Sequence, residues 1–374
     1  MTTPPDSQPI GRINEQDIMD LLLTSSIRLP PLEISLVRTD TALGDSARRR
    51  QPDALVDMAW GDQQQQRFVV EIKATSTPKA VDVAASQATA YANPPATYPM
   101  VLVPFLSEDE IARLEKRGVC GVDLSGNGVV MVPGRLFVLR SGQPNRFRES
   151  RTIRNVYRGA SSVVARVLLV RSPYASVTEV FNEIRSRSGN VVLSTVSKAL
   201  KRLDEDLVVS RKAGQIKLLQ PDRLIDRLAE NYERPSIRDA QRVKSSMNLT
   251  GLFAVLKQVS AEERIRLAVT GASSANRYTA MAQERILSVY CSRLRPLLSE
   301  TSSFLDAATR FPNIEFIETR DPSAYFDTRS EDGIPWASPI QTYLELIAGD
   351  KRQRQVAEQV RMGIISESAG AEQD

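Results

Sequence analysis

The fold is decided by a segment that contains PDALVDMAW at residues 52–60, GDQQQQ at residues 61–66 and FVVEIK at residues 68–73. Two mostly apolar runs around a polar tip predict a β-hairpin. Side chains two residues apart on a strand point to the same face, so Glu71 and Lys73 share one face. Asp53 stands just before the first strand. The pattern therefore predicts a hairpin that presents two carboxylates and a lysine.

These residue types suit a hard cation. Asp53 and Glu71 can hold Mg²⁺ through oxygen, while the ammonium of Lys73 orients water or steadies charge that develops on a phosphate. Asp57, four residues beyond Asp53, is the alternative aspartate ligand if no bulge intervenes. The same pattern also fits a solvated strand face or a cross-strand ion pair. Both interpretations stay open.

The hairpin resembles the motif of the PD-(D/E)XK superfamily, with Asp53 as its aspartate and Glu71-Ile72-Lys73 as its E-x-K. Gln87 and Tyr91, in an expected helix at residues 81–92, are similar to the Q-x-x-x-Y element of some members. The resemblance implies a restriction-endonuclease-like fold and a catalytic site of Asp53, Glu71, Lys73 and Gln87 that uses Mg²⁺. It also allows that the site has lost activity.

The order of the expected elements matches the α-β-β-β-α-β core of that fold. Around the hairpin we expect a helix at 14–23, a strand near 33–37, a helix at 81–92, a strand at 100–104, a helix at 108–117 and strands at 119–124 and 129–132. These elements predict a nuclease-like α/β domain at residues 1–133.

Composition excludes several classes of enzyme. The chain has 374 residues, which predicts two or three domains, and 41% hydrophobic and 25% charged residues, which is ordinary for a globular protein. It has no histidine, which excludes Ser-His-Asp and Cys-His catalysis and most zinc hydrolase sites. No phosphate-binding loop motif is present. Cys120 and Cys291 lie in apolar runs and are expected to be buried free thiols.

The sequence has no feature of a membrane or secreted protein. It contains no stretch of about eighteen apolar residues, and its N-terminus lacks the basic and apolar regions of a signal peptide. We expect a cytoplasmic, nucleoid-associated protein with no membrane partner.

Positive charge is concentrated in the middle of the chain. Residues 134–220 contain 17 Lys and Arg against 6 Asp and Glu, a local excess of +11, which leaves −7 for the rest of a chain whose net charge is +4. Such an excess is typical of a nucleic-acid-binding segment. Its first part, residues 134–160, is rich in arginine and is predicted to be a basic linker.

Residues 161–222 have the pattern of a winged helix-turn-helix domain. We expect helices at 162–171, 176–187 and 194–206, with Ser176 and Glu179 as a capping box, and wing strands at 207–211 and 216–219. The third helix would enter the major groove of duplex DNA and the wing would contact phosphate. The expected DNA-binding side chains are Ser194, Ser197, Lys198, Lys201, Arg202, Arg211, Lys212 and Lys217. A merely solvated charged face is the alternative.

Residues 223–365 predict a third, α/β domain. We expect a helical connector at 224–246, a helix at 252–256, strands at 266–270, 286–290 and 314–318, and helices at 339–346 and 351–362. Residues 271–278 form either a strand-to-helix turn that serves packing or a loop that cradles a nucleotide. The tail, residues 366–374, is small and polar and is expected to be disordered.

The C-terminal part is similar to the AbiEi-like antitoxin family of type IV toxin–antitoxin systems, through segments 268–278, 324–327 and 337–346 in that order. Segment 121–127 is similar to an element that precedes the winged helix in such proteins. The resemblance implies a winged helix for operator binding, a nucleotidyltransferase-like C-terminal domain, a nucleotidyltransferase-like toxin as partner and a homodimer. The long nuclease-like domain departs from the usual antitoxin pattern.

Two functional hypotheses therefore compete. In the preferred one, the chain is an α/β multidomain DNA-binding regulator of a toxin–antitoxin or phage-defence operon. In the alternative, the winged helix delivers a live Mg²⁺-dependent endonuclease to DNA.

Overall fold

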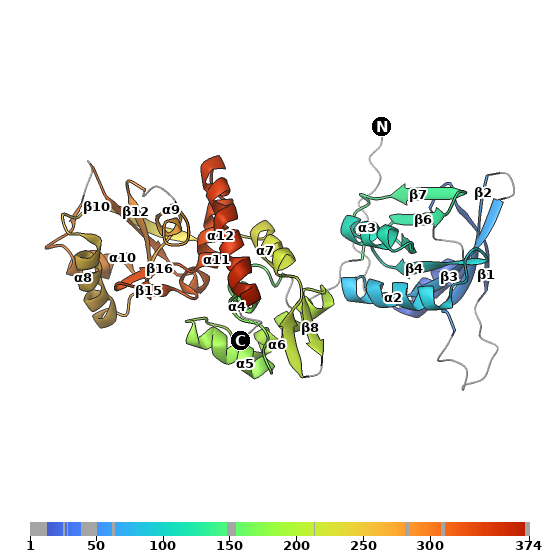
Figure 1. Cartoon of the computed structure of the whole chain (residues 1–374), viewed down its shortest axis with the longest axis horizontal. Helices are drawn as coiled ribbons and strands as arrows, with labels where there is room; N and C mark the ends of the chain where they lie inside the picture. The colour runs from blue at the N-terminus through green and yellow to red at the C-terminus, as the bar shows by residue number, and fades with distance from the viewer. Residues whose placement is uncertain are drawn as a thin grey trace. The chain divides into compact units, whose positions relative to one another are not determined.

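The computed structural model describes residues 13–24, 27, 29–38, 51–61, 64–147, 155–212, 214–280, 284–307 and 311–370. The chain is a mixed α/β protein with two large mixed sheets (Figure 1). It divides into two compact units, Met1–Thr152 and Ile153–Asp374, with one large sheet in each. Within the described residues, no helix is both long and apolar enough to cross a membrane.

The first unit contains three helices and seven strands among its described residues. In chain order they are α1 (Glu15–Leu23), β1 (Glu33–Arg38), β2 (Ala54–Trp60), β3 (Gln64–Ile72), α2 (Pro78–Tyr91), β4 (Thr97–Val103), α3 (Glu108–Lys116), β5 (Cys120–Asp123), β6 (Gly128–Val132) and β7 (Leu136–Arg140). Three helix starts are capped by the side chains of Asn14, Thr77 and Ser107, each of which accepts a hydrogen bond from a backbone N–H of the first turn.

The strands of the first sheet lie in chain order from β1 to β7. Strands β1, β2 and β3 form an antiparallel meander, β3, β4 and β5 run parallel, and β5, β6 and β7 are again antiparallel. Helix α2 connects β3 to β4 and α3 connects β4 to β5, because parallel neighbours require a crossover. The hairpin expected at residues 52–73 is β2 and β3, and its carboxyl end lies at the start of this crossover.

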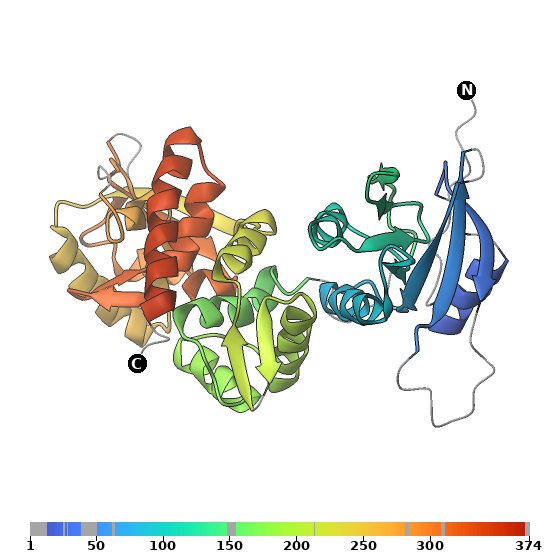
Figure 2. The same cartoon turned by 45° about the vertical axis from the view of Figure 1, so that its right-hand side comes forward.

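Helices cover both faces of this sheet. One core lies against α1 and includes Ile18, Val70 and Ile72; the other lies under α2 and α3 and includes Val101 and Val103. Figure 2 shows α1 on one side of the strands and α2 and α3 on the other. Alternation along β3 therefore decides which side chains face α2.

The linker was expected to begin at residue 134, which is too early in the chain. Leu136–Arg140 forms β7, which pairs with β6 along its whole length. The sequence did not predict this strand because its apolar residues Phe137 and Leu139 are exposed, at 58% and 50%, so that apolar and polar residues do not alternate between a buried and an exposed face. Residues 148–154 of the expected linker lie outside the described residues.

The second unit opens with three helices and a hairpin. A short 3₁₀ helix, η2 (Gly159–Ser161), leads into α4 (Ser162–Val170), α5 (Val177–Ser186), α6 (Leu193–Glu205), β8 (Val209–Lys212) and β9 (Gln215–Leu218). Ser176 caps α5 by accepting from the N–H of Glu179, as expected, but the carboxylate of Glu179 accepts from Ala175 N–H rather than completing the capping box. Figure 2 shows α4 to α6 gathered beside the β8–β9 hairpin.

The remainder of the second unit is built around the second sheet. Its elements are α7 (Pro221–Glu230), β10 (Ile237–Lys244), α8 (Leu249–Glu262), β11 (Leu267–Val269), α9 (Ala272–Ala275), β12 (Leu287–Cys291), α10 (Leu294–Glu300), β13 (Asp306–Ala307), β14 (Ile314–Thr319), the 3₁₀ helix η3 (Pro322–Tyr325), β15 (Arg329–Glu331), β16 (Ile334–Trp336), α11 (Pro339–Ile347) and α12 (Lys351–Gly370). The strand order is β13-β10-β14-β12-β11-β16-β15.

One hydrophobic core joins the two parts of this unit. It includes Leu168 of α4, Leu200 of α6, Leu228 of α7, Tyr343 of α11 and Val360 of α12. The division expected between residues 161–222 and 223–365 is therefore not a boundary in the packing. The sheet has its own core, in which α8 and α10 pack against β10, β11, β12 and β14.

Two other expectations for this unit are corrected. The connector expected to be helical at 224–246 ends its helix at Glu230, because Pro235 follows, and then forms β10, which pairs with β14. The tail expected to be disordered from residue 366 continues α12 to Gly370, with Ile364 and Ser368 buried. Residues 371–374 lie outside the described residues.

Candidate functional site

The hairpin register places Asp53 beside Glu71. Ala54 of β2 pairs with Val70 of β3, so Asp53, one residue earlier, stands opposite Glu71, one residue later. Glu71 also pairs with Val101 of β4, which packs in the core under α2. Paired residues of neighbouring strands point to one face, so Glu71 points to the side of the sheet that α2 covers.

Three of the four expected catalytic residues converge there. The ammonium Nζ of Lys73 lies 3.5 Å from Oε2 of Glu71 and 4.0 Å from Oδ2 of Asp53. The same Oδ2 of Asp53 accepts a hydrogen bond of 2.7 Å from the backbone N–H of Ile72. The side chain of Glu71 is only 4% exposed, whereas Asp53 is 39% exposed. One carboxylate is therefore buried and the other faces solvent.

The Glu71 carboxyl is strongly perturbed. Burial, followed by the charge of Asp53 and a hydrogen-bonding contact with its carboxyl group, raises the pKa of Glu71 to about 7; Lys73 opposes the rise. The lysine thus compensates only part of the negative charge. A site with two facing carboxyls and one cation is short of positive charge when both are ionised.

Asp57 lies away from this cluster. It pairs across the hairpin with Arg67 and accepts hydrogen bonds of 2.7 and 2.8 Å from that guanidinium. The bond from Arg67 lowers the pKa of Asp57. Asp57 is four positions along the chain from Asp53, about 13 Å at the usual rise of a strand. Asp57 is therefore not the alternative ligand, and sequence analysis missed Arg67 as its partner because the partner follows from the register.

Gln87 does not belong to the cluster of Asp53, Glu71 and Lys73 either. It is exposed on α2 and, in the part of the chain that the structure describes, makes no hydrogen bond with Asp53, Glu71 or Lys73. The helix buries Val81, Ala84, Ala85 and Ala88, and Gln87 is not one of these buried positions.

The donor set at this site fits Mg²⁺ only together with further ligands. Among the described residues, no group of three or more His, Cys, Asp or Glu side chains is placed to hold a metal ion. Asp53 and Glu71 supply hard carboxylate oxygens, although Asp53 Oδ2 already accepts from Ile72. Magnesium is commonly held by one or two carboxylates with waters and substrate phosphates. The two side chains suit that mode of binding.

Asp123, in the segment that resembles the antitoxin element, has a structural role. It is buried, and its carboxylate accepts hydrogen bonds from the backbone N–H groups of Leu106, Ser125 and Asn127. The Asn127 side chain in turn donates a hydrogen bond to the carbonyl of Gln143 and accepts one from the backbone N–H of Gln143. This network fixes the β5–β6 turn and the chain beyond β7.

Helix α6 presents a polar face to solvent. Val196, Ala199, Leu200 and Leu203 are buried, and the opposite side carries the expected residues Ser194, Ser197, Lys198 and Lys201, all exposed. Lys201 has a 74% exposed side chain and lies 4.0 Å from Glu205.

Arg202 differs from its neighbours on α6. Its guanidinium lies 3.0 Å from Asp206 and 3.8 Å from Glu205, and Asp206 also accepts from the hydroxyl of Tyr157 at 2.8 Å. The side chain is 34% exposed. Arg202 is thus tied to its own helix, unlike Lys198, which makes no ion pair with any residue that the structure describes.

The β8–β9 hairpin adds three exposed cations, Arg211, Lys212 and Lys217. Sequence analysis missed two exposed aliphatic residues at the start of α6, Val192 and Leu193, at 62% and 44% exposure. A valine in place of the usual Ser, Thr, Asp or Asn before a helix was the signal that could have found them.

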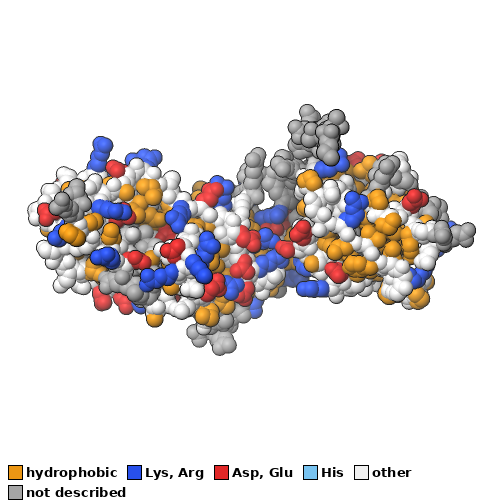
Figure 3. All heavy atoms as spheres, turned by 90° about the horizontal axis from the view of Figure 1, so that it is seen from above, with side chains coloured by type: hydrophobic (Ala, Val, Ile, Leu, Met, Phe, Trp, Pro, Cys, Tyr) orange, Lys and Arg blue, Asp and Glu red, His pale blue; other side chains and the backbone are white. Residues whose placement is uncertain are grey.

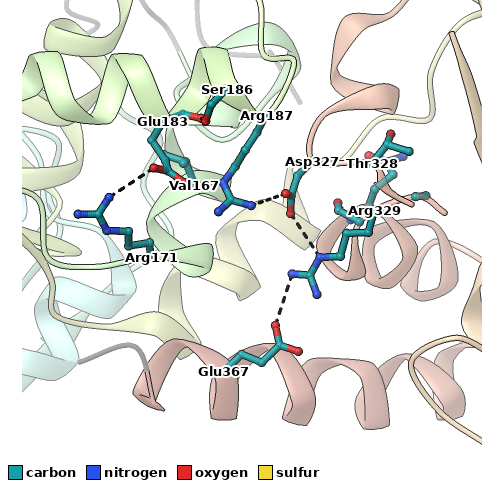
Figure 4. Close-up of polar contacts among 12 residues, drawn as sticks. Val167, Arg171, Glu183, Ser186, Arg187, Asp327, Thr328, Arg329 and Glu367 are labelled. Carbon is teal, nitrogen blue, oxygen red and sulfur yellow. Dashed lines mark hydrogen bonds and ion pairs between the residues drawn. The ribbon is translucent and has the colours of Figure 1, made fainter. Parts of the chain in front are cut away.

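A chain of ion pairs fixes α5 to the C-terminal part of the unit (Figure 4). Arg187, which follows α5, donates to Glu183 at 2.8 Å and to Asp327 at 2.5 Å. The N–H of Asp327 donates back to the carbonyl of Arg187 at 3.0 Å. Arg329 and Glu367 continue the chain to α12. These contacts hold the turn before α6 in one position.

The turn at residues 271–278 is filled by the protein's own carboxylate. Oε2 of Glu345 accepts hydrogen bonds from the Thr270 hydroxyl, at 2.6 Å, and from the Gly271 N–H, and Oε1 accepts from Gln341 at 2.7 Å. Gly271 has φ +58°, which suits glycine. The donors that a nucleotide-cradling loop would offer to phosphate are engaged here, which favours the packing interpretation of this turn.

Charge alone does not locate the interface. The face of the second unit seen in Figure 3 carries Lys and Arg interspersed with Asp and Glu rather than one basic patch. The candidate interface therefore depends on the α6 face and hairpin rather than on the net excess.

Comparisons with known proteins give no relative. No protein-family model matches the chain, and neither the curated proteins nor the solved structures that were compared with it include a similar one.

Proposed function

We propose that the protein binds duplex DNA through α6 and the β8–β9 hairpin, in the manner of a winged helix, and acts as a transcriptional regulator of the antitoxin kind. The observation that carries the proposal is the exposed side of α6, where Ser194, Ser197, Lys198 and Lys201 face solvent beside a cationic hairpin. A three-helix arrangement followed by a hairpin can place such a helix in the major groove.

The packing supports a rigid presentation of α6. Its apolar side is buried in a core shared with α4, α7, α11 and α12. The Arg187 and Asp327 contacts fix the preceding turn. A recognition element held in this way loses little conformational freedom on binding.

The test removes two cations. In the variant Lys198→Ala/Lys201→Ala, we expect mobility-shift assays with duplex DNA at two salt concentrations to show weaker binding, and the log-log salt dependence to flatten by about one unit per lost phosphate contact. The matched control is Lys244→Ala/Lys257→Ala, which removes two exposed lysines from β10 and α8 of the same unit. Equal losses in both variants would contradict the proposed interface.

A transcriptional regulator should protect a specific DNA sequence in a footprinting experiment. A dimer places two recognition helices about one helical turn, roughly 34 Å, apart, so the protein should protect an inverted repeat in its own promoter. Uniform protection without sequence preference would argue against a regulator and leave only non-specific DNA binding.

A second candidate function is metal-dependent cleavage of DNA, favoured by the convergence of Asp53, Glu71 and Lys73. Bound Mg²⁺ would supply a Lewis acid for phosphodiester hydrolysis. Asp53 and Glu71 would hold it, and Lys73 would lie beside the phosphate charge. The pKa of about 7 for Glu71 allows this carboxylate to ionise near neutral pH, where metal binding favours the ionised form.

Cleavage is tested by nicking of supercoiled plasmid with Mg²⁺ or Mn²⁺. We expect Glu71→Gln and Asp53→Asn to abolish nicking, whereas Asp57→Asn, on β2 and paired with Arg67, should retain it. If wild type and Glu71→Gln nick equally, the activity does not belong to this site.

A further inference from the structure

We infer that Val192 and Leu193 determine specificity by reading the C5 methyl groups of thymine in the major groove. This inference rests on the proposed DNA binding by α6 and extends it from affinity to base identity. The two residues precede and begin α6, and both are exposed, at 62% and 44%.

The start of α6 carries an aliphatic residue at the N-cap, where α4, α7, α9 and α10, which also lack a side-chain cap, have Ser161, Gln220, Gly271 and Arg293. Val192 occupies the N-cap position and no side chain caps the helix there, whereas α5 and α8 use Ser176 and Asn248. A valine at this position forgoes the stabilisation of a capping side chain. The aliphatic side chain therefore does not stabilise α6 by capping it.

The charges around Val192 and Leu193 favour duplex DNA as the partner that contacts them. Ser194, Ser197, Lys198 and Lys201 continue along the same helix from Leu193, and Arg211 and Lys212 lie on the hairpin. A protein partner with an apolar contact at one end would have to match this cationic and hydroxylic surface. Duplex DNA matches both, with phosphates for the cations and thymine methyl groups for the aliphatic end.

The position on the helix also fits base contact. In helix-turn-helix proteins, residues at the start of the recognition helix reach the base edges, while residues further along and in the wing contact the backbone. Thymine is the base that offers an apolar group in the major groove, and aliphatic side chains are its usual contacts. Adenine-thymine pairs are therefore expected at the centre of each half-site.

The experiment uses the full-length protein and a library of random short duplexes. The preferred duplex is selected and then synthesised with thymine or with uracil, which differ only in the C5 methyl group. For wild type we expect uracil to weaken binding about fourfold for each methyl group contacted. Single substitutions along the duplex will locate the contacted positions.

The variant Val192→Ser/Leu193→Ser should bind the thymine and uracil duplexes equally. It should fold, and its melting temperature should be maintained or raised, because serine at the N-cap supplies the missing cap. Lys198→Ala/Lys201→Ala should weaken both duplexes by the same factor and keep the difference between them.

The outcomes separate the two proposals. If no duplex is selected or bound, DNA binding by α6 is wrong and the inference falls with it. If wild type binds the selected duplex but does not distinguish thymine from uracil, or if the double serine variant still distinguishes them, DNA binding stands and the inference is overturned.

Discussion

Glu71 in the first unit and Glu345 in the second are both buried in polar clusters, and the two clusters differ in how completely the neighbours compensate the carboxylate. Glu345 in the second unit has both carboxylate oxygens engaged by neutral donors from Thr270, Gly271 and Gln341. Glu71 in the first unit faces another carboxylate and a single lysine. The first arrangement is complete without a ligand, whereas the second lacks positive charge.

This difference distinguishes a structural cluster from a candidate site. Burial raises the pKa of both glutamates, so a raised pKa alone does not identify function. The neighbours decide: hydrogen-bond donors that match every acceptor stabilise a fold, whereas like charges held together are useful only if something else binds between them.

The largest effect is expected from Glu345→Ala. The change leaves the Thr270 hydroxyl, the Gly271 N–H and one of the two N–H bonds of the Gln341 amide without an acceptor, which should cost about 3–5 kcal/mol. The chain has two tryptophans, Trp60 and Trp336, so urea unfolding in a Trp60→Phe background follows the second unit through Trp336 alone. Glu345→Gln is the control, because it keeps one acceptor oxygen and should cost less. Equal losses would mean that neither the shape nor the one acceptor oxygen that glutamine keeps stabilises the cluster.

The next effect concerns the pH dependence of the first unit. The pKa of Glu71 is raised from 4.5 to about 7, so the folded state binds its proton more tightly than the unfolded state. The stabilisation is fully present below pH 4.5 and is lost as the pH rises through 7. We expect the free energy of unfolding to fall over this range by up to about 3 kcal/mol.

Trp60, in a Trp336→Phe background, reports this transition in urea melts at pH 5 and pH 8. Glu71→Gln should remove most of the pH dependence and make the unit more stable than wild type at pH 8, because the amide does not repel Asp53. A wild-type protein that is equally stable at both pH values would show that burial and the facing Asp53 do not raise the pKa of Glu71 in solution.

Much of this site follows from the sequence. The alternation on one strand puts Glu71 and Lys73 on one face, and the structure confirms the hairpin that brings Asp53 beside them. The exclusion of Asp57 from the cluster could not be predicted. Its distance from Glu71 and its pairing with Arg67 depend on the register of the two strands rather than on spacing along one strand.

The missed strands have a common physical cause. Of the residues of β10, only Val243 is buried, and β7 exposes two of its apolar side chains, so neither strand alternates as a half-buried strand should. Hydrogen bonds to β14 and β6 hold them instead. The core shared by α4, α11 and α12 was equally hidden, because contacts between distant segments leave no local pattern.

Stabilisation of the first unit by a metal ion should depend on Asp53 and not on Asp57. At pH 8, Mg²⁺ or Mn²⁺ at tenfold its dissociation constant should stabilise the first unit by about 1.4 kcal/mol. Asp57→Asn should keep this stabilisation and Asp53→Asn should lose it, as measured by urea melts of Trp60 with and without metal. Metal stabilisation that survives in Asp53→Asn would place the ion elsewhere and remove the main support for cleavage at this site.

The smallest effect should come from Asp57→Asn itself, and its sign should oppose that of Glu71→Gln. The hydrogen bond from Arg67 lowers the pKa of Asp57 below 3.8, so the ionised carboxylate stabilises the folded state above that pH, and the contribution is lost as the pH falls through the lowered pKa. Arg67 is partly exposed and can be hydrated when its partner is removed, which keeps the loss small. Urea melts of Trp60 at pH 8 should therefore show a slightly less stable Asp57→Asn variant and a more stable Glu71→Gln variant. If both changes stabilised the unit, Asp57 would also be a strained carboxylate, and the comparison would no longer single out Asp53 and Glu71 as the place where a cation binds.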